Sequence, residues 1–217
     1  MKATAFLIGS LFTTLAWTGA NAAVISTNSI TGTDPSLDDP YKTGKIDDSN
    51  ITASGIGRGA GITGSTTSNR YSAKNWSTAF DATDYFTFTL DANDGYEINF
   101  ENFVYTGTAS GTGPKTFLLR SSLDGYTADI GSPTAAGTTI DLSASQFQNL
   151  TTPVEFRFYG YGSSGGGGTF SINDYTFNGM VNSVPVPEPG TLALLGVGSL
   201  LMFGNLCRTR RPLKTME

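Results

Sequence analysis

The stretch of this chain that decides its fold is Val154-Glu155-Phe156-Arg157-Phe158-Tyr159-Gly160-Tyr161. Val154, Phe156 and Phe158 fall on one face of an extended chain, and the more polar residues alternate with them on the other. A period of two residues predicts a half-buried β-strand. The Gly-rich segment 162–168 follows, and residues 169–178 form a second run of this kind. We interpret the segment between the two strands as a hairpin connection or a flexible flap.

Similar strands recur along the preceding part of the chain, and turn residues separate them. No soluble stretch shows a sustained helical period, while Gly, Thr, Ser and Asn are abundant and aromatic residues are frequent. A slip in alternation near Glu101 predicts a β-bulge or a short break, and residues 143–150 suggest a helical turn. The predicted fold is therefore all-β, a two-sheet antiparallel sandwich of the jelly-roll-like kind. Its further strands are expected at residues 24–31, 50–57, 85–90, 96–100, 102–108, 115–122 and 138–142.

The first 22 residues have the pattern of a secretory signal peptide. Met1 and Lys2 give a positive start, residues 3–17 are mostly apolar, and Ala20-Asn21-Ala22 is a small-x-small cleavage site. Such a segment is removed on export. The alternative is an uncleaved N-terminal anchor, which Thr13 and Thr14 disfavour because they dilute the apolar run.

The other end of the chain combines three parts in a fixed order. Pro187-Glu188-Pro189 comes first, an apolar run over 191–207 follows, and a basic cluster closes it at Arg208, Arg210, Arg211 and Lys214. A helix of that apolar length reaches roughly 25 Å, enough to cross a bilayer, and the basic cluster favours a cytoplasmic end. We therefore expect one transmembrane helix at 191–207 with a basic cytoplasmic tail. A buried core helix is the alternative.

These three parts resemble the PEP-CTERM sorting signal of exported bacterial proteins, here over residues 185–217. The resemblance implies export by the general secretion route and membrane anchoring. Recognition of the tripeptide by an exosortase and release to the cell surface or the extracellular space would follow. It also implies an association with exopolysaccharide and biofilm. The same tail is known as a C-terminal domain of ice-binding proteins. Ice binding needs a flat Thr-x-Thr array over several strands, and Thr87-Phe88-Thr89 is an isolated instance.

Removal of both ends leaves residues 23–184, which suit one ectodomain with a sizeable core. Of the 13 basic residues of the chain, five lie outside this range, as do two of its 18 acidic residues, so the ectodomain carries about −8. That charge opposes binding to nucleic acid or anionic lipid. The chain has no His, and its single Cys lies at position 207. Ser-His-Asp and Cys-His catalysis and the usual zinc sites are therefore excluded.

A second resemblance concerns the last predicted strand, Thr169-Phe170-Ser171-Ile172-Asn173-Asp174. It is similar to the Phe-x-Ile-Asp-Asn ending of carbohydrate-binding jelly rolls, whose Asp can hold structural calcium. The resemblance implies calcium at Asp174, although the order Asn173-Asp174 exchanges the two side chains between the faces of the strand. No other cofactor is expected.

Sugar binding is the function that these residues favour. Aromatic rings stack on the apolar faces of pyranoses, and neighbouring polar groups bind the hydroxyls. The alternative is that Trp76 is a core residue and the tyrosines form ordinary cross-strand pairs. The candidate residues are Trp76, Tyr159, Tyr161 and Tyr175, beside Arg120 and Arg157.

Two functions from different classes remain open. One is a non-enzymatic surface or matrix protein that associates with exopolysaccharide, and the other is a structural or adhesive module without a defined ligand. A glycan-active enzyme would need a pair of carboxylates with separated pKa values. Asp81 with Asp84 and Asp91 with Asp94 are such pairs, but solvated turn formers explain them more simply. We therefore predict that the protein is not an enzyme.

Overall fold

The computed structural model describes residues 23–185. The predicted signal peptide, the tripeptide 187–189, the predicted membrane helix 191–207 and the basic residues after it lie outside this range. Within residues 23–185, no helix is both long and apolar enough to cross a bilayer.

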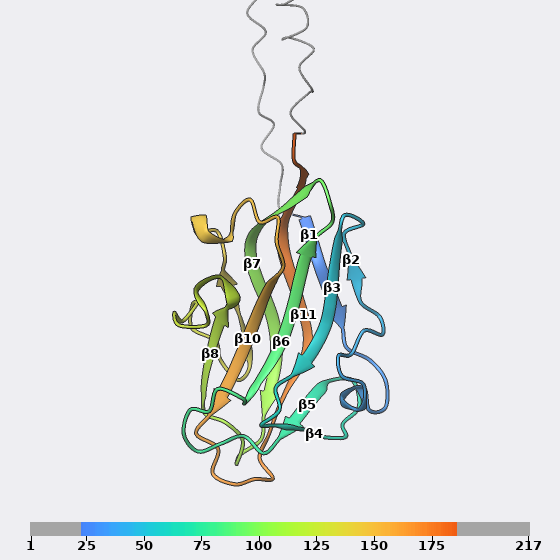
Figure 1. The fold of residues 1–217 in the computed structure, drawn as a ribbon. Coiled ribbons are helices and arrows are strands. Elements are labelled where there is room, and N and C mark those ends of the chain that lie inside the picture. The colour runs from blue at the N-terminus through green and yellow to red at the C-terminus, as the bar shows by residue number, and fades with distance from the viewer. Residues whose placement is uncertain (1–22, 186–217) are drawn as a thin grey trace, which may run out of the picture. The chain divides into compact units, whose positions relative to one another are not determined.

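Eleven strands form two antiparallel sheets in the described part of the chain (Figure 1). The four-stranded sheet has the order β3-β6-β10-β8, with β3 at Ile51–Arg58, β6 at Tyr85–Ala92, β10 at Val154–Tyr161 and β8 at Thr116–Ser121. The seven-stranded sheet contains β1 (Ala23–Ser29), β2 (Ile46–Asp47), β4 (Thr63–Gly64), β5 (Tyr71–Lys74), β7 (Tyr96–Ala109), β9 (Gly137–Asp141) and β11 (Thr169–Ser183). Three short 3-10 helices accompany them, η1 (Pro35–Leu37), η2 (Ser122–Asp124) and η3 (Ser145–Phe147). The all-β, two-sheet prediction is confirmed.

Strand β11 is the centre of the larger sheet. It pairs along one edge with β7, and along its other edge with β5 and then β1. Strands β9, β2 and β4 lie outside β7, β1 and β5. Successive strands from β6 to β11 alternate between the two sheets. The finer jelly-roll assignment stays a prediction.

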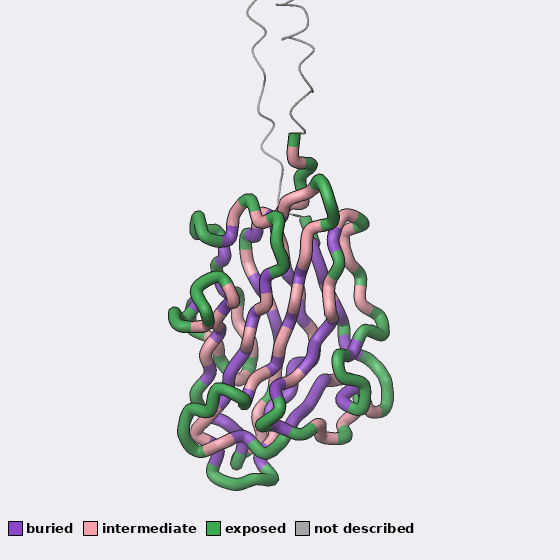
Figure 2. Tube along the Cα trace, viewed as in Figure 1, coloured by how far each residue is buried: buried purple, intermediate pink, exposed green. Residues whose placement is uncertain are grey.

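Aromatic side chains from both sheets fill the space between them. Val154, Phe156 and Phe158 are fully buried, as the alternation of β10 predicts. The ring of Phe158 stacks on that of Phe170 in β11 at 5.5 Å and meets Tyr105 in β7 edge-on at 4.9 Å. Figure 2 shows the same alternation of buried and less buried residues along the strands. Burial of such rings supplies the main driving force for a sandwich that has no disulfide.

The expected hairpin between the last two strands is wrong. Strand β10 pairs with β6 and β8, whereas β11 lies in the other sheet, so the Gly-rich segment crosses between sheets. The reason is that the apolar faces of β10 and β11 pack against each other across the core, and strands that do so cannot also lie side by side. Two hydrogen bonds hold the crossing segment in place. The Ser163 hydroxyl and the Ser164 N–H both donate to the carbonyl of Thr112.

The irregularities that the sequence suggested are present. Asn102 and Phe100 pair with the consecutive residues Asn178 and Gly179, so Glu101 is the extra residue of a β-bulge. The helical turn expected after residue 143 is η3. Strands β2, β4 and β5 could not be predicted, because strands of two to four residues carry too little alternation to be recognised.

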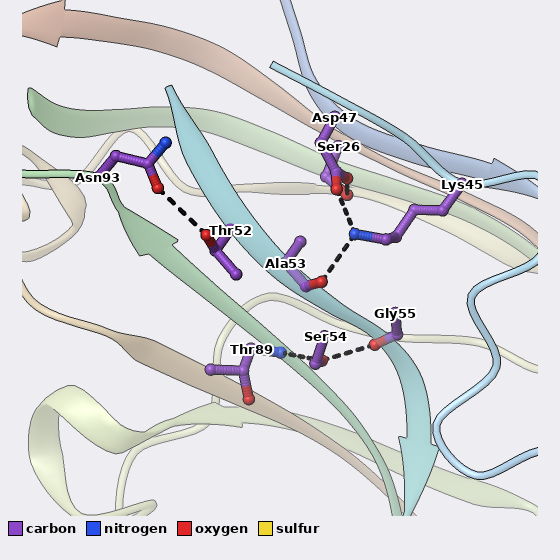
Figure 3. Close-up of polar contacts among 9 residues, drawn as sticks. All are labelled: Ser26, Lys45, Asp47, Thr52, Ala53, Ser54, Gly55, Thr89 and Asn93. Carbon is purple, nitrogen blue, oxygen red and sulfur yellow. Dashed lines mark hydrogen bonds and ion pairs between the residues drawn. The ribbon is translucent and has the colours of Figure 1, made fainter. Parts of the chain in front are cut away.

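A polar cluster ties the first strands together (Figure 3). The ammonium of Lys45 donates to the carboxylate of Asp47 and, at 2.7 Å, to the carbonyl of Ala53 in β3. The hydroxyl of Ser26 in β1 donates to the same carboxylate at 2.7 Å. The side chain of Lys45 is only 11% exposed, and an ammonium group that is largely removed from water needs hydrogen-bond acceptors within the protein. These bonds hold β1, β2 and β3 against one another at one side of the sandwich.

Both ends of the described chain lie at the same end of the sandwich. Ala23 pairs with Gly179, and Ser183, the last residue of β11, pairs with Tyr96. Strand β1 therefore begins at the end of the sandwich at which β11 ends.

Candidate functional site

The outer face of the four-stranded sheet carries an unusual set of aromatic and basic side chains. Strand pairing places Tyr85, Tyr159 and Leu118 in one row across β6, β10 and β8. Arg157 and Arg120 lie side by side in the next row. Residues paired across strands share a face, so these side chains come together on the side of the sheet that points away from the core.

Phe80, from the segment between β5 and β6, lies over this face. Its ring centroid is 5.4 Å from that of Tyr159 and 6.0 Å from that of Tyr161, whose ring is nearly perpendicular to it. Phe80 is 44% exposed, whereas Tyr159 beneath it is 2% exposed. We call Phe80, Tyr159 and Tyr161 the aromatic platform.

Arg120 supports the platform from one side. Its guanidinium carbon lies 5.1 Å from the centroid of Phe80 and 5.8 Å from that of Tyr159, within cation–π range of both. Its Nε donates to Asp129 at 2.7 Å, and its Nη1 donates to the carbonyl of Tyr126 at 3.2 Å. These contacts fix the orientation of the ring above them.

Arg157 lies between two tyrosine rings. Its guanidinium carbon is 4.4 Å from the centroid of Tyr85 and 3.9 Å from that of Tyr126. Its Nε donates to Glu155 at 2.6 Å, and the hydroxyl of Tyr126 donates to the same carboxylate oxygen at 3.0 Å. Burial works to lower the pKa of Arg157, but the bonds to Glu155 outweigh it and hold that pKa above its usual range. Burial, helped by the charge of Glu155, raises the pKa of Tyr126 to about 12.

Asp81 lies next to Phe80 in the chain and is exposed. Its Oδ1 accepts the hydroxyl of Thr83 at 2.7 Å and the N–H of Thr83 at 2.8 Å. The hydroxyl bond, followed by the backbone bond, lowers the pKa of Asp81 below its usual range. The residue that follows Phe80 in the chain therefore carries an ionised carboxylate in neutral and mildly acidic solution.

Beyond the described residues, a family model gives the identity of the C-terminal end. The model of the PEP-CTERM protein-sorting motif matches residues 185–211. The chain carries a PEP-CTERM sorting motif. It includes the predicted Pro187-Glu188-Pro189 and the basic residues through Arg211. A comparison with curated proteins found no match.

A PEP-CTERM motif identifies an exported protein that an exosortase processes and sorts to the cell surface. Because the motif covers only the end of the chain, it leaves the task of the sandwich to be inferred from the sandwich itself.

Two of the four predicted sugar-binding residues of this PEP-CTERM protein lie in the core. Trp76 is 2% exposed, donates from Nε1 to the carbonyl of Ala73 at 2.9 Å and packs edge-on against Phe86. Tyr175 is equally buried, with its ring 4.8 Å from Phe88. Neither presents a ring face to solvent. Trp76 is therefore a core residue, which was the alternative to its predicted role in sugar binding.

The other two candidates, Tyr159 and Tyr161, both belong to the platform, and Arg120 and Arg157 lie around it. The sequence reasoning missed Phe80 and Tyr126. Both stand in turn-like segments, where an isolated aromatic residue has no periodic neighbours, and this isolation is itself the signal that could have found them.

The acidic candidates lie elsewhere and have ordinary partners. Asp174 is in β11, where its carboxylate accepts the hydroxyl of Thr106 on the neighbouring strand. Within residues 23–185, no three acidic, His or Cys side chains lie close enough together to hold a metal ion. Calcium at Asp174 stays a prediction. Asp84 is buried and its Oδ2 accepts the N–H of Ser77 at 2.7 Å, so it has a structural role that the exposed Asp81 does not share.

Proposed function

We propose that the mature protein is a non-enzymatic surface or matrix protein that associates with exopolysaccharide through its aromatic platform. The observation that carries this proposal is the exposure of Phe80, which is 44% exposed while the tyrosine beneath it is buried. Single exposed apolar residues are common on protein surfaces, but Phe80 differs because Tyr159, Tyr161 and Arg120 hold its ring in place at the surface.

The platform has the chemistry that a pyranose requires. Phe80 offers an apolar face, and Tyr161 stands nearly perpendicular to it, so the two rings form a corner. The contacts of Tyr159 and Arg120 beneath and beside Phe80 reduce the freedom that the ring would lose on binding.

The PEP-CTERM motif supports the location that this function needs. Before processing, we propose that the predicted helix 191–207 anchors the protein in the membrane and that the basic residues after it keep the tail in the cytoplasm. Processing at or near Glu188 would then leave the sandwich outside the cell, where exopolysaccharide is present.

A structural or adhesive module without a ligand is the second candidate. The position of Arg157 between Tyr85 and Tyr126 favours this second candidate. The charged and polar groups of this part of the outer face already have partners within the protein and need no ligand. The two candidates make different predictions for the platform, because Phe80 keeps exposed surface that its contacts within the protein do not cover.

Co-sedimentation with purified exopolysaccharide from the producing cells separates the two. The mature protein recovered from the medium is mixed with the polymer, together with the variants Phe80→Ala and Tyr161→Ala. Leu37→Ala is the matched control, because Leu37 is also a large exposed apolar residue, 70% exposed, in η1. Saturable binding that both platform variants lose and the control keeps supports the proposal. Equal sedimentation of all four proteins contradicts it.

A further inference from the structure

We infer that the platform takes an uncharged polysaccharide and rejects polymers of uronic acids or sulfated sugars. This inference rests on the proposed function and adds the ligand class to it. It follows from how the charges around Phe80 are used.

The charge of the first cation near the platform is already paired within the protein. Arg120 is paired with Asp129 at 2.7 Å, donates to the carbonyl of Tyr126, and lies over the rings of Phe80 and Tyr159. A ligand carboxylate would either displace Asp129 and leave it without its partner, or share the guanidinium with Asp129 against the repulsion between two like charges. Such an exchange gains little.

The charge of the second cation is also paired within the protein. Arg157 is paired with Glu155 at 2.6 Å, and tyrosine rings lie against it at 4.4 and 3.9 Å. The Tyr126 ring that covers it is held by a bond from its hydroxyl to Glu155. Tyr126 would have to move before an anionic ligand could reach the face of the guanidinium that its ring covers.

The surroundings of the platform are acidic. Asp81 adjoins Phe80, and the ectodomain as a whole carries about −8. Among the other cations of the described range, Lys45 and Arg58 are paired with Asp47 and Asp39, whereas Lys42, Arg70 and Lys74 form no ion pair with described residues. Lys115 donates to the carbonyls of Ser110 and Gly111. A polyanion would therefore meet net repulsion, which in solution is felt over about 8–10 Å at moderate salt.

The same groups suit a sugar that has hydroxyls and no charge. Both bonds from Thr83 end on Oδ1 of Asp81, so its Oδ2 remains available to accept a sugar hydroxyl. The pyranose ring would stack on Phe80, and stacking on an apolar ring needs no ion pair. Affinity should then depend little on ionic strength.

Titration calorimetry of the mature protein tests this inference, with a soluble neutral β-glucan and an alginate as the two probes. Each is measured at low and high salt, with the native protein, Phe80→Ala, Asp81→Asn and the control Leu37→Ala. We expect the native protein to bind the glucan with an affinity that changes less than about twofold with salt. Phe80→Ala should lose about tenfold or more of that affinity, and Asp81→Asn should weaken it through the lost acceptor. Alginate should not bind.

The outcomes separate the inference from the proposal beneath it. Salt-sensitive binding of alginate that is lost in Phe80→Ala and strengthened in Asp81→Asn overturns the uncharged-ligand inference while the platform remains a glycan site. Binding of neither probe, together with failure to sediment with the native exopolysaccharide, overturns the proposed function itself. Glucan binding that Phe80→Ala leaves unchanged overturns the inference, because the platform would then not be the site.

Discussion

The ring of Phe80 lies over that of Tyr159, with centroids 5.4 Å apart, and the two residues differ sharply in exposure. One faces solvent and the other is closed beneath it. Phe80 is therefore expected to contribute to glycan binding and Tyr159 to folding stability, and mutation of each residue separates the two contributions.

Phe80→Ala should reduce glycan binding and leave folding stability nearly unchanged, with a loss of less than about 1 kcal/mol in the free energy of unfolding. Tyr159→Ala should cost about 2–4 kcal/mol, because a buried aromatic side chain leaves a cavity that the face cannot refill. Urea unfolding measures both values. A large loss for Phe80→Ala would mean that its ring is structural, which would weaken the binding proposal.

Phe158 should be among the most sensitive positions of the core. It is fully buried between the sheets and contacts Tyr105 and Phe170. Phe158→Ala is expected to cost about 3–5 kcal/mol, much of the stability of a small domain, whereas Phe158→Leu should cost about half as much because less volume is lost. Thermal and urea unfolding compare the two. Similar stability of both variants would contradict the sheet-on-sheet packing.

Gly55 and Gly95 give a matched test of the packing of Tyr41 against β3, to which an antiparallel bridge between Tyr41 and Ile56 joins it. Both have positive φ, at 83° and 81°, so alanine is strained at either position. At Gly55 a Cβ would also lie 2.2 Å from the carbonyl oxygen of Tyr41, whereas at Gly95 there is open space. Gly95→Ala should therefore cost about 1 kcal/mol and Gly55→Ala several times more. Equal losses would indicate that Tyr41 does not pack against β3 as described.

Alkaline pH should destabilise the protein through its tyrosines. Burial raises the pKa of Tyr105 and of Tyr126 to about 12, and it raises those of Tyr71 and Tyr175 as well. In the unfolded chain these phenols titrate near about 10. The pKa of these phenols is higher in the folded protein than in the unfolded chain. Their contribution to the free energy of unfolding is therefore complete below pH about 10 and is lost as the pH rises through about 12.

The midpoint of urea unfolding, measured from neutral to strongly alkaline pH, checks this prediction. It should fall above pH about 10, and tyrosinate absorbance should appear later in the native protein than in the unfolded one. Tyr126→Phe should make the fall shallower. A midpoint that stays constant through this range would contradict the burial of these hydroxyls.

The fold could be predicted from the sequence where local alternation is strong. Val154 to Phe158 and Phe86 to Leu90 show which face is buried because each strand carries its own pattern, and the slip at Glu101 marks a bulge for the same reason. Which sheet a strand joins does not depend on its local sequence alone. The sequence places β10 and β11 next to each other, and only the match of their apolar faces across the core separates them into two sheets.

The candidate site was harder to predict, because it depends on contacts between distant segments. Tyr159 and Trp76 are equally buried, yet one supports a surface ring and the other fills the core. The alternation of β10 places Tyr159 on the outer face, whereas Trp76 follows β5 in a segment without alternation. Phe80 reaches the outer face because its segment folds over β10, and that fold is set by bonds such as the one from the N–H of Ser77 to the buried Asp84.

The most direct test of the account is the mass of the protein recovered from the exopolysaccharide fraction of producing cells, with native sequence and with Glu188→Ala. The account predicts a native product that begins at Ala23 and ends near residues 187–190, and that is absent from this fraction when Glu188 is replaced. Recovery of a chain that still ends at Glu217, in the same amount for both sequences, would contradict delivery by the sorting motif.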